Sequence, residues 1–368
     1  TAILFEGANP VNEVNINLVN STATTGGITG ILAKGTGTLT NSGNITVNGA
    51  YGLGIYATGA ASTVTSSKNI TLIGDEVIAA FGTNNSNINL TSGTVTLTGN
   101  KSTGYYLNGG TASSILSPTK INITGNESNG VYVNNGASLT YSGDTKVVGD
   151  AAYGLIVDNT STVNTTGGTL TVSGTGTNPS KTNANRGSAA LVVTKNSTLG
   201  GGKLDVTANV SGKNSVGIYS AGNLTIDSAN ISAYDSAVNF YTNGGTISIG
   251  NNGGTSTVVT GTGATQGALL FYTPTGRVLL NGTVNATVEG STDTIKRGTA
   301  FYYTGTGTLG NIASYTQFNP TNVAIWGRSS YGNGGVSTLG KLNLTMNKDS
   351  RLFLTERVNV NLSNTSVT

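Results

Sequence analysis

The sequence predicts an all-β protein, a right-handed parallel β-helix whose coils each hold three strands and about 25 residues. Three observations support this prediction. The 368 residues include 55 glycines, and only 9% are charged, a composition that disfavours helices. Short segments alternate between apolar and polar residues, which is typical of strands. The same apolar positions also return at a nearly constant interval, which is typical of a solenoid.

The interval is clearest in three sets of apolar residues. One set of anchors has steps of 24, 25, 25, 26 and 24 residues: Leu32, Tyr56, Phe81, Tyr106, Tyr132 and Ile156. A second has steps of 25, 25 and 26: Ile45, Ile70, Val95 and Ile121. A third position lies about seven residues after an anchor: Val64, Ile88, Leu139, Val163, Ile247, Val278 and Leu309. Each repeat therefore contains three short strands.

Glycine and asparagine between the strands fit this architecture. Both residues tolerate the positive φ that tight corners need. A single coil cannot bury its apolar side, but a stack of coils can, so the repeats stabilise one another. Stacked threonine or asparagine can also form hydrogen-bonded ladders from one coil to the next. We expect one β-helical domain over residues 1–368.

Departures from the interval predict inserted loops. After Ile156 we place the anchors at Val192, Phe240, Phe271 and Tyr302, with Trp326 as a looser copy, and the steps lengthen to as many as 36 residues. The extra residues follow the third strand of a coil, near 173–189, 251–264 and 289–299. Because they follow the same strand, we expect them to project from one corner of the solenoid.

The composition excludes several kinds of active site. The chain has no His and no Cys, so it has neither a Ser-His-Asp or Cys-His catalytic group nor a thiolate or histidine metal site. Its net charge of +3 is far from the dense positive field that nucleic acids require. We expect no catalytic residues, no metal, no cofactor and no nucleic-acid partner.

An aromatic stripe is the first candidate binding feature. In Gly130-Val131-Tyr132-Val133 the two valines share one face of the strand, and Tyr132 takes the other. With the aliphatic residues inside, the same alternation places an outward stripe of tyrosines at Tyr56, Tyr106, Tyr132 and Tyr219, which Trp326 would extend. Exposed aromatics bind sugars and protein partners. Alternatively, each tyrosine only packs across the sheet, or the rings point into the core.

Cations in the inserted loops are the second candidate feature. Lys181 and Arg186 lie in the first loop, and Lys296 and Arg297 lie in the third. Loops on a rigid scaffold often carry function, although variable solvated loops have the same composition.

Carboxylates are too sparse to indicate an enzyme. Asp75-Glu76 is the one adjacent acidic pair, and the equivalent position one repeat later is near Lys101. The polysaccharide lyases and hydrolases built on β-helices need clustered acids. The Gly-Asp dipeptides do not form a calcium-binding repeat.

The repeats resemble the passenger regions of type V autotransporters, notably fusobacterial-type adhesins. The resemblance rests on segments such as Ser128-Asn129-Gly130-Val131-Tyr132-Val133-Asn134-Asn135-Gly136-Ala137 and Lys120-Ile121-Asn122-Ile123-Thr124-Gly125, and it covers nearly the whole chain. It implies a β-helix displayed on the bacterial cell surface and anchored in the outer membrane through a C-terminal barrel that this sequence does not include.

The resemblance also implies a function, adhesion to host-cell receptors, to glycans or to other microbial surfaces. We therefore expect a cell-surface adhesin that is not an enzyme and does not itself span the membrane. Two alternatives stay open: a β-helical polysaccharide-active enzyme, and a passive spacer whose binding module lies elsewhere. An ice-binding solenoid is disfavoured because the threonine positions drift between repeats.

Overall fold

The computed structural model of the chain describes residues 1–19, 27–109, 113–176, 187–308, 325–329, 332–338 and 340–359. These residues contain strands and turns but no helix, and they form a parallel β-solenoid of about 11 turns with a repeat of about 25 residues. This confirms the predicted fold class. The chain divides into two compact units, residues 1–173 with 197–199 (unit 1) and residues 174–196 with 200–368 (unit 2).

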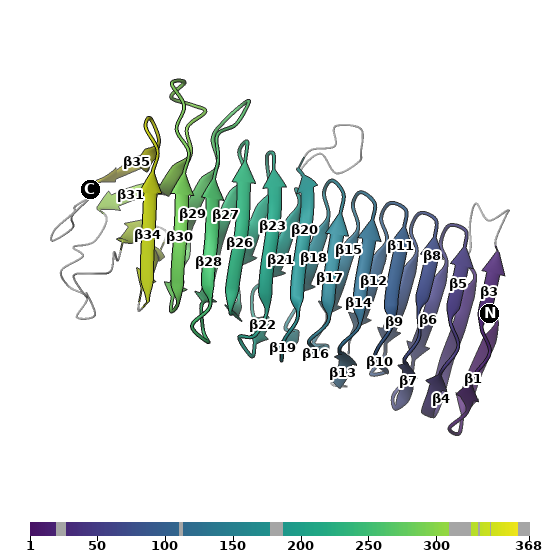
Figure 1. Cartoon of the computed structure of the whole chain (residues 1–368). Coiled ribbons are helices and arrows are strands. Elements are labelled where there is room, and N and C mark those ends of the chain that lie inside the picture. The colour runs from purple at the N-terminus through teal and green to yellow at the C-terminus, as the bar shows by residue number, and fades with distance from the viewer. Residues whose placement is uncertain are drawn as a thin grey trace. The chain divides into compact units, whose positions relative to one another are not determined.

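In unit 1 the coils stack side by side as three walls, with one strand per coil in each wall (Figure 1). The first wall holds β1 (Ile3–Gly7), the start of β4 (Thr29–Asn41), β6 (Leu53–Thr58), β9 (Ile78–Thr83), β12 (Thr103–Asn108), β15 (Asn129–Asn134) and β18 (Tyr153–Val157). The second wall holds β2 (Val11–Asn12), the end of β4, β7 (Ser62–Ser66), β10 (Asn87–Leu90), β13 (Ser113–Leu116), β16 (Ser138–Tyr141) and β19 (Thr162–Thr165). The third wall holds β3 (Ile16–Val19), β5 (Ile45–Asn48), β8 (Ile70–Ile73), β11 (Thr94–Thr98), β14 (Lys120–Thr124), β17 (Asp144–Val148) and β20 (Thr169–Thr175).

The predicted intervals in unit 1 are direct strand pairings. The first-wall anchors, from Leu32 to Ile156, pair Cα to Cα in six successive strands. The third-wall residues Ile45, Ile70, Val95 and Ile121 pair in the same way. Side chains at equivalent positions of successive coils therefore form columns along the stack, and the columns that point inward make the core.

A column of small residues on the first wall explains the glycine that precedes each aliphatic pair. A Cβ on Gly104 would lie 2.7 Å from the Gly130 carbonyl oxygen and 2.7 Å from Ile121 Cγ2 on the third wall. The equivalent residue one coil earlier is Ala79, and the third-wall residue of that coil is Val95 in place of isoleucine. The glycines of this column therefore lie close both to the carbonyl of the next coil and to the third-wall side chains.

Unit 2 has the same three walls. Its first wall holds β21 (Ala189–Val193), β24 (Val216–Ser220), the start of β27 (Val238–Ile249), the start of β29 (Leu269–Leu280), β31 (Thr299–Thr308) and β35 (Arg351–Asn359). Its second wall holds β25 (Asn223–Ile226), the ends of β27 and β29, and β33 (Gly332–Thr338), while β22 (Thr198–Gly200) begins in unit 1. Its third wall holds β23 (Asp205–Ser211), β26 (Ser228–Tyr234), β28 (Thr255–Thr260), β30 (Thr283–Val288) and β34 (Lys341–Met346).

The predicted register in unit 2 is wrong by one residue at two anchors. Phe240 pairs with Ile218, Phe271 pairs with Phe240, and both are buried inside the coil with Phe301. Their rings stack at centroid distances of 5.5 and 5.4 Å. The partners of Tyr219 are instead Tyr241 and Tyr272. Strand side chains alternate, so a shift of one residue exchanges the core face for the outer face.

The predicted insertions are partly corrected as well. Within 251–264, residues Thr255–Thr260 form β28, a wall strand whose Ser256, Val258 and Thr260 are buried, so the prediction of a loop is wrong there. Residues 289–298 are the loop between β30 and β31, in agreement with the predicted 289–299. Of the predicted 173–189 loop, residues 177–186 lie outside the described residues.

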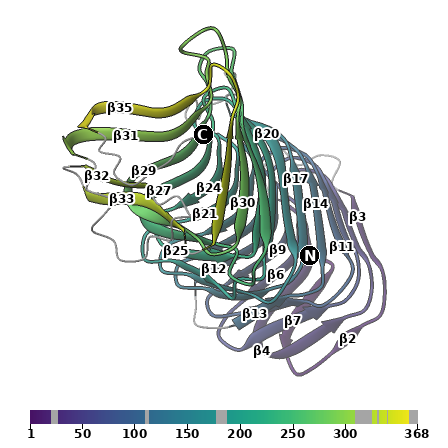
Figure 2. The same cartoon turned by 60° about the vertical axis from the view of Figure 1, so that its left-hand side comes forward.

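A longer departure in unit 2 was not predicted. Val278 pairs with Val336, which is 58 residues later, so this coil has more than twice the usual length. β32 (Ile325–Ser329), which contains Trp326, pairs antiparallel with β33, and the two lie side by side in Figure 2. Trp326 therefore does not continue the tyrosine column. Leu309, a predicted third-strand position, lies outside the described residues.

We predict that Gly104→Ala lowers the free energy of unfolding by about 1–3 kcal/mol, because the added methyl group would overpack the contact with Ile121. Adding Ile121→Ala removes the contacting Cγ2 methyl group, so the double variant should lose less stability than the two single variants added together. Gly200→Ala is the control, because a Cβ there has no atom within 4 Å. Chemical denaturation followed by circular dichroism measures the original protein, each single variant, the double variant and the control. Additive effects of the two first substitutions would contradict this explanation.

Candidate functional site

The predicted tyrosine stripe forms an outward aromatic ladder in unit 1. Tyr56, Phe81, Tyr106 and Tyr132 are half-buried, while their neighbours Ile55 and Val131 are fully buried. The ring centroids of successive rungs lie 5.1, 5.0 and 4.9 Å apart, with interplanar angles of 9°, 13° and 6°. The rings therefore face outward, and the alternative with the rings in the core is wrong.

The stacking restricts what this ladder can bind. Phe81 and Tyr106 have an aromatic ring against both faces, and the column continues to Leu32 on one side and Ile156 on the other. A sugar that stacks on an aromatic residue needs a free ring face. The ladder thus presents ring edges and tyrosine hydroxyls to solvent, and much of its role is to hold neighbouring coils together.

Tyr219 belongs to a second ladder, in unit 2, with Tyr241, Tyr272 and Tyr302. These rings are also half-buried and lie 5.1, 4.8 and 5.1 Å apart. Their stacking is less regular, because Tyr219 meets Tyr241 edge-on at 75° and the next two angles are 30° and 31°. The sequence prediction missed Tyr241 and Tyr272 because its register was shifted by one residue at these two strands, whereas Tyr302 was a predicted anchor that was not included in the stripe.

The structure describes two of the four basic residues that were predicted as binding residues. Lys181 and Arg186 lie outside the described residues. Lys296 forms an ion pair with Asp293 (3.4 Å), and Arg297 Nε donates a hydrogen bond to the Ser291 carbonyl oxygen (2.8 Å). Both side chains therefore help to shape the loop between β30 and β31. They lie at a corner of the solenoid and not on the first wall with the tyrosines.

This loop is part of an ordered corner cluster in unit 2, which we define as residues 235–236, 261–268, 289–298 and 347–351. Figure 1 shows the turns that follow β26, β28, β30 and β34 along one edge. The Gly267 amide donates to the Ile295 carbonyl (3.0 Å), and the Ser291 amide donates to the Asp349 carbonyl (3.3 Å). Further bonds join Thr265 N to Asp235 Oδ1 (2.9 Å), Thr262 N to Glu289 Oε2 (3.3 Å) and Arg351 Nη2 to the Thr294 carbonyl (2.5 Å).

An exposed isoleucine stands out in the corner cluster. Ile295 is 63% exposed, next to Asp293 and Lys296. The hydrogen bond from the Ile295 amide, and then the Lys296 partner, lower the pKa of the Asp293 carboxyl, so this acid is charged at neutral pH. Single exposed apolar side chains are common on protein surfaces, and Ile295 is distinguished by its place on a hydrogen-bonded loop between two charged residues. Sequence composition alone does not show that the loop is ordered.

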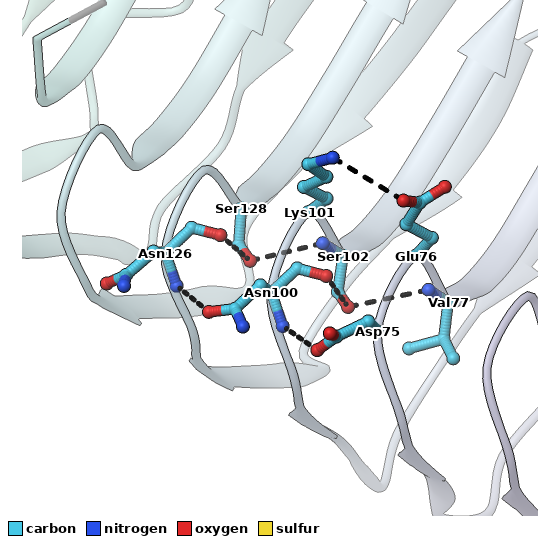
Figure 3. A network of polar contacts seen from close by, with 8 residues as sticks. All are labelled: Asp75, Glu76, Val77, Asn100, Lys101, Ser102, Asn126 and Ser128. Atoms are coloured by element: carbon cyan, nitrogen blue, oxygen red, sulfur yellow. Dashed lines mark hydrogen bonds and ion pairs between the residues drawn. The ribbon is translucent and has the colours of Figure 1, made fainter. Parts of the chain in front are cut away.

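The equivalent corner of unit 1 carries a polar ladder (Figure 3). Asn100 N donates to Asp75 Oδ1 (2.7 Å), Asn126 N donates to Asn100 Oδ1 (2.9 Å), and Asp150 N donates to Asn126 Oδ1 (2.9 Å). The following residues have positive φ in every coil: Glu76 (58°), Lys101 (54°), Glu127 (56°) and Ala151 (52°). Glu76 pairs with Lys101 at 3.5 Å, so these positions do not form an acidic column, as the sequence predicted.

The acidic side chains at this corner hold neighbouring coils together. The Asp75 carboxylate accepts a backbone hydrogen bond, and Glu76 faces a lysine. Within the described residues no three His, Cys, Asp or Glu side chains come together in a way that could hold a metal ion. Side chains also bond between coils on the second wall, where Asn12 Nδ2 donates to Asn41 Oδ1 (2.7 Å) and Asn41 Nδ2 donates to Ser66 Oγ (2.9 Å), which confirms that asparagine forms ladders between coils.

Three tyrosines have strongly perturbed phenols. Burial raises the pKa of Tyr105 and of Tyr141 above the ordinary value near 10. Burial, followed by the nearby Asp158 carboxylate, raises the pKa of Tyr132, whose hydroxyl donates to Asp158 Oδ2 (3.0 Å). These groups therefore stay neutral in the folded protein well into the alkaline range.

Comparison with known proteins finds no matching family model, no matching curated protein and no matching solved structure. In the part of the chain that the structure describes, no helix has the length and apolarity needed to span a membrane.

We predict that Asn100→Ala lowers the free energy of unfolding by about 0.5–1.5 kcal/mol, because the Asn126 amide loses its acceptor. Asn100→Asp keeps the acceptor but places a charge next to Asp75. Its stability should therefore rise toward the original value with added salt, which screens the repulsion. Urea denaturation at two salt concentrations measures the effect. An alanine variant as stable as the original protein would contradict a role for the ladder.

We predict that the protein loses stability above about pH 10. The pKa values of Tyr105 and Tyr141 are raised in the folded state, so their stabilisation is complete below the unfolded pKa and is lost as the pH rises toward the folded values. Thermal unfolding across this range measures the decline. The variant Tyr105→Phe/Tyr141→Phe should show a flatter dependence, and an unchanged slope would contradict the assignment.

Proposed function

We propose that this chain is the display scaffold of a cell-surface adhesin and that it binds a protein ligand through the corner cluster of unit 2. The single observation that carries the proposal is the exposed Ile295, held between Asp293 and Lys296 on a loop that hydrogen bonds to its neighbours. A preorganised loop loses little entropy on binding. The resemblance of the repeats to autotransporter passenger regions supports a location at the bacterial surface, anchored in the outer membrane.

The surrounding architecture suits this role. In each unit the columns of inward residues are buried along the walls, so loops at a corner can vary without disturbing the core. Host-cell receptors or proteins of other microbial surfaces are the partners we propose. The first aromatic ladder supports glycan binding less well, because its ring faces are covered.

A passive spacer is the second candidate. One observation favours it: the charged groups of Lys296 and Arg297 interact within their own loop. Binding measurements separate the two candidates, because a spacer binds nothing through this corner.

The experiment compares wild-type chain with Ile295→Asp and with Lys296→Glu in binding to intact host cells and to bacterial cells. We expect either substitution to weaken binding by roughly tenfold or more, as for a central contact residue. Ile73→Asp is the matched control, since Ile73 is an exposed isoleucine (44%) on the third wall of unit 1. Circular dichroism checks the fold. Binding that all three variants retain would favour the spacer.

A further inference from the structure

We infer that Tyr106 and Tyr132 form a site of oxidative modification, in which a one-electron oxidant of the peroxidase class joins the two rings as dityrosine. Such a bond would tie two successive coils of unit 1 covalently. The inference does not depend on the proposed function. It rests on ring geometry, on a proton acceptor and on the composition of the chain.

The geometry is suited to radical coupling. Tyr106 and Tyr132 are direct Cα partners in β12 and β15, and their ring centroids lie 4.9 Å apart with an interplanar angle of 6°. The unpaired electron of a phenoxyl radical occupies a π orbital, so two radicals couple best when their ring faces meet. The rings are half-buried, which leaves an edge of each open to an oxidant.

Tyr132 also has a built-in proton acceptor. Its hydroxyl donates to Asp158 Oδ2 at 3.0 Å, and Asp158 directly follows β18 in the next coil. Because the Tyr132 phenol stays neutral in the folded protein, it must lose a proton together with the electron. A hydrogen-bonded carboxylate accepts that proton without a diffusive step.

The coupling reaction conserves atoms and electrons. Each phenol gives one electron to the oxidant and loses its hydroxyl proton, which passes to Asp158 in the case of Tyr132. The two radicals form one carbon–carbon bond between the positions ortho to the oxygens. Each ring then moves its ortho hydrogen, through water, to its oxygen and regains aromaticity. Two electrons and two protons leave in total, and they reduce one hydrogen peroxide to two waters.

The composition directs oxidation to tyrosine. The chain contains no Cys and no His, one Met and one Trp, but 15 tyrosines. Thiols, which are oxidised more readily and would repair tyrosyl radicals, are absent from the sequence. Phe81 is the neighbouring rung on the other side of Tyr106 and cannot form a phenoxyl radical, so Tyr132 is the coupling partner within this ladder.

The test treats the full chain with a haem peroxidase and hydrogen peroxide and follows dityrosine fluorescence. After isolation of the monomer, tryptic digestion should release peptide 102–120 covalently linked to peptide 121–146. The mass of the linked pair should be lower than the sum of the two peptides by two hydrogen atoms. Fragment ions should assign the bond to Tyr106 and Tyr132. The linked monomer should also unfold at a higher temperature than the untreated protein, because the bond constrains the unfolded chain.

Three variants sharpen the test. Tyr132→Phe should abolish this link but keep the stack, as Phe81 does. Asp158→Asn should slow coupling by about tenfold or more. Tyr51→Phe, on an exposed corner tyrosine, should change nothing. The inference is overturned if dityrosine does not form, if it forms only between molecules, or if it joins only tyrosines other than this pair. A coupling rate that is unchanged in Asp158→Asn would remove the proposed role of the carboxylate.

Discussion

Stacking of parallel strands at about 4.8 Å is the constraint on which the rest of the structure depends. Because each coil lies directly on the previous one, every residue meets its own equivalent, and the fold is built from columns. The rings of the first aromatic ladder keep this spacing, with centroids 4.9–5.1 Å apart. A column tolerates only residues that are compatible with a copy of themselves or with a close relative. Aliphatic residues, aromatic rings and hydrogen-bonding amides meet this condition, and like charges do not.

This constraint explains how polar residues are used. At the corner of unit 1, Asp75, Asn100 and Asn126 each accept the amide of the next coil, so the side chain that shapes one turn also holds the next. Charges alternate where they do stack, as in Glu76 and Lys101. Polar side chains at these positions are therefore used to hold neighbouring coils together.

The corner cluster and the tyrosine pair illustrate two uses of the same scaffold. At the corner, extra residues leave the column and form a separate hydrogen-bonded surface around Ile295. In the ladder, the column itself brings Tyr106 and Tyr132 face to face. The first suits recognition of a partner, and the second suits a reaction between neighbouring coils.

The sequence by itself determined the strands, the three-walled coil and the 25-residue interval, since periodicity two and a constant repeat leave one arrangement in unit 1. It left open whether Tyr56, Tyr106 and Tyr132 face outward or into the core, and the burial of the neighbouring aliphatic residues in the folded chain decides that they face outward. It could not decide the register at Phe240 and Phe271, because adjacent aromatic residues satisfy either face and only packing against Ile218 selects the buried one. Nor could it show that Lys296 is paired, that the ring faces of the ladder are covered or that Asp158 reaches Tyr132. The ladder and the Tyr132–Asp158 contact join residues from different coils, and the Lys296–Asp293 pair depends on the shape of its loop, so only the folded chain brings these groups within bonding distance.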